Sequence, residues 1–186
     1  MADGAIWGWL AGATLAATML AVVPGWEGGT AERAAAIRLD AVPADRGVIV
    51  RSDAVPDGGA VDVRAVCVRG GRRPDITWDR LPNDTAEVAV VTELVERDGT
   101  RRVHDVVLRL DPARAGWHAG GPQTGGDASP FVAPCRSGAS TMRITVVALH
   151  SPLLAGIDGG DSAATVLDAL AAHATARRTI SAAFPR

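Results

Sequence analysis

The stretch CVRGGRRPDITWDRLP at residues 67–82 sets the architecture that we expect for this chain. Over residues 61–67, apolar side chains alternate with polar ones, which is the period-two pattern of a strand with one buried face. A Gly-Gly pair then interrupts the pattern, and Pro74 favours an extended backbone that leads to Trp78. The two arginines that follow the glycines cannot be buried without partners. We therefore expect two strands that meet at a basic turn with solvated arginines.

Further short strands are predicted on both sides of this corner, so the domain should be mainly β. Residues 48–50 form a short apolar run. Residues 88–92 are continuously apolar, as in a strand that is covered on both faces. The turn at residues 97–100 should join that strand to residues 102–110 as a hairpin. Residues 143–149 predict one more buried strand.

The last part of the chain predicts a loop and a helix. Residues 117–133 are rich in Gly, Pro, Ser and Ala, which is typical of a functional or disordered loop. Apolar residues recur at helical spacing over residues 163–178, and Ser162 can cap that helix. Arg177 and Arg178 would lie in its last turn, where positive charge suits the helix dipole. We interpret this C-terminal helix as a structural lid on the sheet.

The first residues predict a membrane segment. Residues 5–23 contain no charge, and a bilayer-spanning helix needs about 20 apolar residues. There are two alternatives. One is a cleaved signal peptide, although the positively charged residues that normally begin such a peptide are missing. The other is a buried core helix. We expect a membrane anchor or signal segment at residues 1–26, a linker at 27–39 and the folded domain at 40–186. The linker could be a flexible tether or a short helix. The domain would then be extracytoplasmic and membrane-anchored, or secreted if the segment is cleaved.

Composition limits the size of the fold and its class of partner. The chain has 186 residues, of which 47% are hydrophobic, which is enough for one ordinary core. Its formal net charge is −2, and its 19 basic residues, all arginine, are scattered among 21 acidic ones. No long basic stripe results, so nucleic acid is not an expected partner.

Three sequence blocks occur in an order that a known family shares. The first block contains Cys67, Gly70, Pro74, Ile76 and Trp78. The second is VHDVV at residues 103–107, the third is APCRS at 133–137, and a closing segment lies at 180–186. Together they resemble the phosphatidylethanolamine-binding protein family, in its bacterial Raf-kinase-inhibitor-like branch. The corresponding family motifs are Cys-x-Gly-x-x-x-Ser-Pro-x-Leu-x-Trp, Val-His-Trp-Val-Val and Gly-Pro-Cys-Pro-Pro, with Arg73 here at the family's Ser.

The resemblance implies a fold and a binding site. The expected fold is a β-sandwich, mainly β with a C-terminal helix and preceded here by an N-terminal hydrophobic helix. The implied pocket takes a small anion such as phosphate, or a phospholipid head group, because imidazole and backbone N–H groups coordinate phosphate oxygens. The candidate ligand-binding residues are His104, Glu93, Pro134, Arg136 and Trp78.

Parts of the implied pocket depart from the family motifs. Residues 93–97 read ELVER where the family has Asp-Pro-Asp-x-Pro, and the family's second histidine falls on Ser140. Arg136, or the arginine pair at 72–73, could supply a replacement donor, since guanidinium binds phosphate oxygens bidentately.

The two cysteines of the chain predict one disulfide. In an oxidising compartment Cys67 and Cys135 are the possible pair, and the resemblance places both at loops that flank the pocket. Two free buried thiols are the alternative.

His104 has two further interpretations besides ligand binding. It could be a half-buried strand histidine that is hydrogen-bonded to a carboxylate such as Glu93. It could also form a catalytic dyad with Cys135, but an extracytoplasmic cysteine is expected to be oxidised. No hydrolase, P-loop or paired CxxC motif is present, and the other histidines have no metal-ligand spacing.

We therefore expect a non-catalytic binding protein without a metal or a cofactor. Its partners would be the membrane, through residues 5–23, and a small anion or phospholipid. The alternative is a structural or protein-interaction domain with a decayed pocket, in which exposed arginines and the loop at 117–133 contact another protein.

Overall fold

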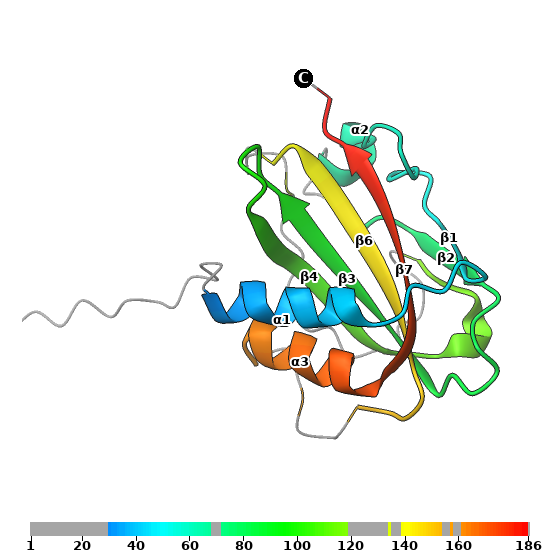
Figure 1. Cartoon of the computed structure of the whole chain (residues 1–186). Helices are drawn as coiled ribbons and strands as arrows, with labels where there is room; N and C mark the ends of the chain where they lie inside the picture. The colour runs from blue at the N-terminus through cyan, green and yellow to red at the C-terminus, as the bar shows by residue number, and fades with distance from the viewer. Residues whose placement is uncertain are drawn as a thin grey trace, which may run out of the picture.

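A four-stranded antiparallel sheet forms the centre of the molecule (Figure 1). The computed structural model describes residues 30–67, 72–118, 134, 139–153, 157 and 161–185. The strands of this main sheet are β3 (Glu87–Val95), β4 (Arg101–Leu110), β6 (Thr141–Leu149) and β7 (Ala174–Ala183), in the order β4-β3-β6-β7. The predicted hairpin is confirmed, because β3 and β4 pair antiparallel across a tight turn. Gly99 has a φ of 85° in that turn, a conformation that favours glycine.

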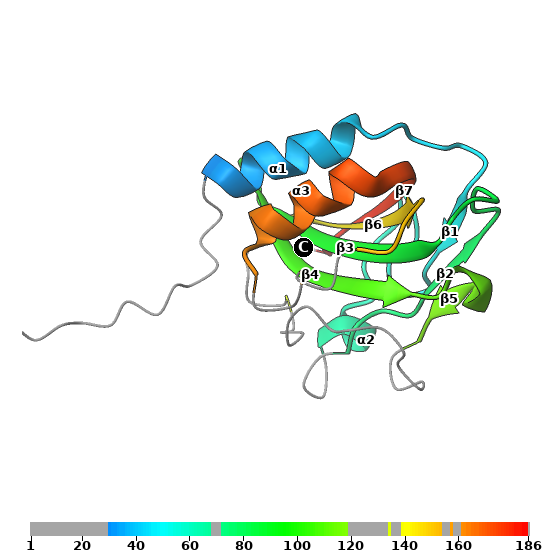
Figure 2. The same ribbon diagram turned by 90° about the horizontal axis from the view of Figure 1, so that it is seen from below.

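Each face of the main sheet packs against a separate layer (Figure 2). Two helices, α1 (Thr30–Ala41) and α3 (Ala163–His173), cover one face, which we call the helix face. A smaller sheet of β1 (Ile49–Arg51), β2 (Ile76–Asp79) and β5 (Gly116–Trp117), in the order β1-β2-β5, lies against the other. A 3-10 turn, η1 (Pro112–Arg114), precedes β5.

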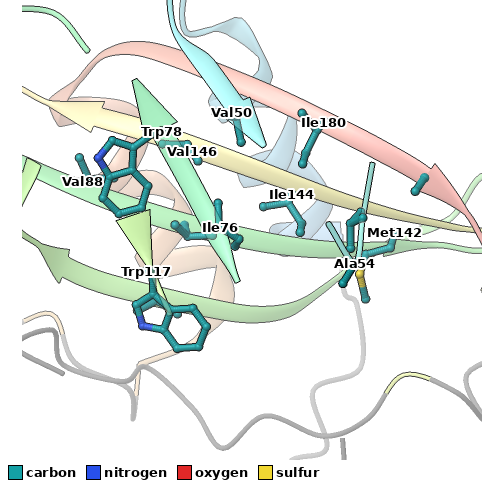
Figure 3. Packing of buried hydrophobic residues seen from close by; sticks show 14 of the residues in the cluster. Val50, Ala54, Ile76, Trp78, Val88, Trp117, Met142, Ile144, Val146 and Ile180 are labelled. Atoms are coloured by element: carbon teal, nitrogen blue, oxygen red, sulfur yellow. The ribbon is translucent and has the colours of Figure 1, made fainter. Parts of the chain in front are cut away.

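Strand periodicity divides the apolar residues between two cores. On β3, Val88 and Val90 point toward the small sheet, whereas Ala89 and Val91 point toward the helices. Both sets are buried, which explains why residues 88–91 are continuously apolar. Figure 3 shows the first of these cores, where Trp78 from β2 packs near Val88 of the main sheet.

The strand predicted over residues 61–67 is wrong, because Val63–Cys67 form the short helix α2. The Asp62 carboxylate accepts hydrogen bonds from the backbone N–H groups of Arg64 and Ala65, at 2.9 and 3.3 Å. This is the usual chemistry of a helix N-terminal cap. In a strand, Val61 and Val63 would lie on the same buried face. In the structure Val61 is buried, whereas Val63 is 36% exposed.

The helix predicted over residues 163–178 is correct at its start and wrong at its end. Ser162 caps α3, its Oγ accepting from the Thr165 N–H at 3.2 Å. The helix ends at His173, and Ala174 already has extended backbone angles. Residues 174–183 instead pair with the whole of β6. Tertiary pairing has overridden a segment that is favourable for a helix by composition.

From residue 30 onward, the predicted linker at residues 27–39 is a helix and not a flexible tether. Thr30–Ala41 form α1, and its side chains Ala35, Ala36 and Leu39 belong to the core on the helix face. The predicted membrane segment at residues 5–23 lies outside the described residues. Within the described part of the chain, every helix is too short or too polar to span a bilayer.

Candidate functional site

A buried ion pair lies at the basic corner that the sequence singled out. The Arg73 Nε and Nη2 atoms donate to the two carboxylate oxygens of Asp105, at 2.7 and 2.9 Å. The side chains of Arg73 and Asp105 are only 13% and 3% exposed. The prediction of solvated arginines is therefore wrong for Arg73, which satisfies the rule that a buried guanidinium needs a partner.

The local strands hold this ion pair in place. Ile76 pairs with Trp117 in the small sheet, so β5 lies beside the segment that carries Arg73. The Arg73 guanidinium carbon lies 5.9 Å from the centre of the Trp117 ring, a cation–π distance. Asp105 projects from β4 toward the same side, since it alternates with Val106, which belongs to the core on the helix face.

A hollow of about 300 Å³ opens next to Arg73. It lies between α2 and the segment that leads into β2. Its lining residues are Asp53, Ala54, Asp62, Ala65, Arg72, Arg73, Pro74 and Asp75. The lining thus offers guanidinium groups that suit a phosphate and carboxylates that suit an ammonium group.

His104 occupies a β-bulge beside the ion pair. On β3, Thr92 pairs with Asp105 and Glu93 pairs with Val103, so His104 has no residue opposite it. A bulge of this kind bends a strand and changes the direction of its side chains, and bulges are common next to functional sites. Sequence alternation could not show the bulge, because it depends on how two strands pair.

Glu32 stabilises that bulge from the helix face. Its Oε1 accepts a hydrogen bond from the Val103 backbone N–H at 2.6 Å, and the Glu32 side chain is buried. A buried carboxylate on α1 therefore satisfies a backbone donor in β4.

Glu93 lies in a charged cluster on the helix face of the main sheet. Arg101 Nη2 donates to both carboxylate oxygens of Glu93, at 2.7 and 2.8 Å, and Arg143 Nη1 lies 3.7 Å away. Asp40, at the end of α1, bonds to the same Arg101. Arg177 completes the charged cluster by donating to the Asp40 backbone oxygen.

Two opposing effects set the pKa of Asp40. Burial raises it, but the hydrogen bond from Arg101 and the positive charges of Arg101, Arg143 and Arg177 outweigh burial and lower it below the ordinary value of 3.8. Burial likewise tends to lower the pKa of Arg101, whereas bonds to Glu93 and Asp40 raise it above its ordinary value. Asp40 and Arg101 therefore stay ionised at neutral pH.

The structure separates Glu93 from Trp78. Glu93 shares the helix face of β3 with Ala89 and Val91, whereas Trp78 lies in the core between the two sheets. Trp78 is 2% exposed, and its indole N–H points to the Pro112 oxygen at 3.4 Å. The two residues that were expected in one pocket thus lie on opposite faces of the main sheet.

The remaining predicted residues are Pro134, Arg136 and the two cysteines. Pro134 is described and buried. Arg136 and Cys135 lie outside the described residues. Cys67 is half-buried at the end of α2 and packs against the core between the sheets. Within the described residues, no cysteine is a free thiol. The pairing of Cys67 with Cys135 stays a prediction, because Cys135 lies outside those residues.

Structural comparison assigns the fold. The sequence matches no protein-family model and no curated protein. The structure is similar to the crystal structure of CT736 from Chlamydia trachomatis, described as a homologue of phosphatidylethanolamine-binding proteins, with a TM-score of 0.64. The sequences are 17% identical, and the alignment covers 76% of this chain and 99% of that one. The chain has a phosphatidylethanolamine-binding-protein-like fold.

Within this phosphatidylethanolamine-binding-protein-like fold, the residues of the buried ion pair are two departures from the family motifs. Arg73 stands where the family motif has Ser, and Asp105 stands where the Val-His-Trp-Val-Val motif has Trp. In the structure these two residues bind each other. Their proximity could not be read from either block alone, because 32 residues separate them in the chain.

Proposed function

We propose that this protein is a non-catalytic, extracytoplasmic binding protein for a small anion or a phospholipid head group. Residues 5–23 would tether it to the membrane. The ligand would enter the hollow beside Arg72 and Arg73 and would contact the segment around His104.

The mixed charge of the hollow is the observation that carries this proposal. Arg72 and Arg73 line it together with Asp53, Asp62 and Asp75. A phosphate that also carries an ammonium group could use both kinds of side chain, whereas a free phosphate could use only the arginines. The fold likeness adds support, since the neighbour is described as a homologue of a phospholipid-binding family.

Titration of the isotopically labelled protein tests the proposal. O-phosphoethanolamine and inorganic phosphate are added separately, while NMR follows the imidazole signals of His104. Saturable shifts at millimolar ligand are expected, with phosphoethanolamine binding more tightly. Arg72→Gln should weaken binding about ten- to a hundredfold, because a charge-assisted hydrogen bond contributes roughly 1.5–3 kcal/mol.

Arg38→Gln is the matched control. Arg38 forms an exposed ion pair with Asp168 on the helix layer, so its loss should leave both titrations unchanged. Vesicles of phosphatidylethanolamine, compared with vesicles of phosphatidylcholine, distinguish a lipid head group from a free anion. Absence of any shift at millimolar ligand in the folded protein would overturn the proposal.

A protein-interaction domain with a decayed pocket is the second candidate, and the ion pairs favour it. Arg73 is bound by Asp105, and Glu93 is bound by Arg101, so side chains that could serve a ligand already have partners in the chain. If all titrations are silent while the protein remains folded, this second candidate is favoured.

A further inference from the structure

His150 and His173 lie next to each other at the end of the main sheet. Leu149, the last residue of β6, pairs with Ala174, the first residue of β7. The His150 backbone N–H then donates to the His173 oxygen at 3.2 Å, which extends the pairing by one step. The two imidazole ring centres are 5.8 Å apart, with 33° between the ring planes.

A neighbouring hydroxyl orients one of these rings. The Ser151 Oγ lies 3.0 Å from His173 Nδ1, within hydrogen-bond distance. A histidine that binds a metal through one ring nitrogen commonly uses the other nitrogen to contact a nearby polar group, which fixes the ring. With Nδ1 engaged in this way, Nε2 is the nitrogen of His173 that can ligate a metal.

We propose that His150 and His173 bind a divalent transition-metal ion. Each ligating nitrogen lies about 2.0–2.1 Å from a zinc ion, so two rings on one ion have centres roughly 5–6 Å apart when the bond angle is tetrahedral or somewhat wider. The observed separation of 5.8 Å falls within that range. Neutral imidazole suits zinc, copper and nickel.

The site is open to solvent and has two protein ligands. His150 is exposed and His173 is half-buried. In the described part of the chain, no group of three or more His, Cys, Asp or Glu residues is arranged to hold a metal. Water would therefore fill the remaining coordination positions, which gives a site of modest affinity. The spacing of the histidines along the chain did not reveal this pair, because the two residues come from different elements.

Calorimetric titration of the full-length protein with zinc chloride tests the inference. One zinc ion per chain is expected for the unaltered protein. His150→Gln and His173→Gln should each weaken binding at least tenfold. His118→Gln and His104→Gln are matched controls, each removing an imidazole elsewhere in the fold, and should leave the affinity unchanged.

A structural measurement completes the test. Because His150 is exposed, its replacement should leave the circular dichroism spectrum unchanged. NMR of the imidazole nitrogens should show zinc-dependent shifts in His150 and His173. Zinc affinity that is equal in the unaltered protein and in His150→Gln would overturn the proposal, and so would a lack of zinc binding at millimolar concentration.

Discussion

At the scale of single residues, the ion pair of Arg73 with Asp105 dominates the basic corner. Both charges are removed from water, so each depends on the other. Sequence reasoning could state that Arg73 needs a partner if buried. It could not name Asp105, because the pairing depends on the approach of the small sheet to β4.

Loss of one partner of this ion pair should be costly. Arg73→Ala leaves the Asp105 carboxylate buried and unpaired, and we expect a loss of about 3–5 kcal/mol in the free energy of unfolding. Urea denaturation measures it. The double variant Arg73→Met with Asp105→Leu should recover part of this loss.

The matched control for that experiment is Arg38→Ala. The side chains of Arg38 and Asp168 are both about half exposed, so the free energy of unfolding should change by less than about 1 kcal/mol. An equal loss of stability in Arg73→Ala and Arg38→Ala would show that burial does not determine how much an ion pair of this protein contributes.

Asp40 should make part of the stability dependent on pH. Its folded-state pKa lies below the ordinary value of 3.8, so its contribution is present above about pH 5 and is lost as the pH falls through the folded-state pKa. Asp40→Asn should lower stability by roughly 1 kcal/mol at pH 7, allowing for solvent screening. The difference from the unaltered protein should shrink below about pH 4.

Denaturation curves at a series of pH values measure this effect. Asp168→Asn is a suitable control, because Asp168 lies in an exposed pair on the helix layer. A difference that stays constant from pH 7 to pH 3 would show that the Asp40 charge is not the cause.

At the scale of elements, the docking of α1 depends on a polar contact as well as on apolar packing. Glu32→Ala would leave the buried Val103 N–H without its acceptor, and we expect a loss of about 1–3 kcal/mol. Glu32→Gln keeps an acceptor oxygen and should lose less. Arg33→Ala, on the exposed side of the same helix, should have little effect.

Hydrogen exchange locates the effect of Glu32→Ala. The amide of Val103 and the amides of α1 should lose protection before those of β6. Protection lost uniformly over the whole sheet would argue against a local role for Glu32.

Some helices and strands could be predicted from the sequence, and others could not. The hairpin of β3 and β4 was predictable, because residues 88–92 are apolar and a turn sequence follows. The end of α3 was not, because Ala174 and its neighbours suit a helix until β6 offers them hydrogen-bond partners. The helix at Val63–Cys67 was missed although Asp62, a capping residue, precedes it.

At the scale of the whole molecule, three layers enclose two cores. The sequence predicted a mainly β fold, and the resemblance predicted its type. The candidate site was less predictable, because whether His104, Glu93 and Trp78 converge depends on strand face and bulge. Glu93 and Trp78 proved to lie on opposite faces of the main sheet.

The predicted bond between Cys67 and Cys135 would join two distant parts of the sequence. Closing a loop of about 68 residues should stabilise the protein by about 4 kcal/mol on the chain-entropy model. Non-reducing mass spectrometry of protein from an oxidising compartment detects the bond, and denaturation with and without reductant measures its effect. Two free thiols in that protein would rule it out.

The irregular pairing of β4 has a consequence for how molecules behave at high concentration. β4 is the first strand in the order of the main sheet, and none of the described strands pairs with its outer side. A straight outer strand can recruit a strand from another molecule and start aggregation. In β4 the register shifts twice, and Arg109 has a φ of 59°. These distortions interrupt the row of backbone donors and acceptors, so they should hinder the pairing of this edge with a strand from another molecule.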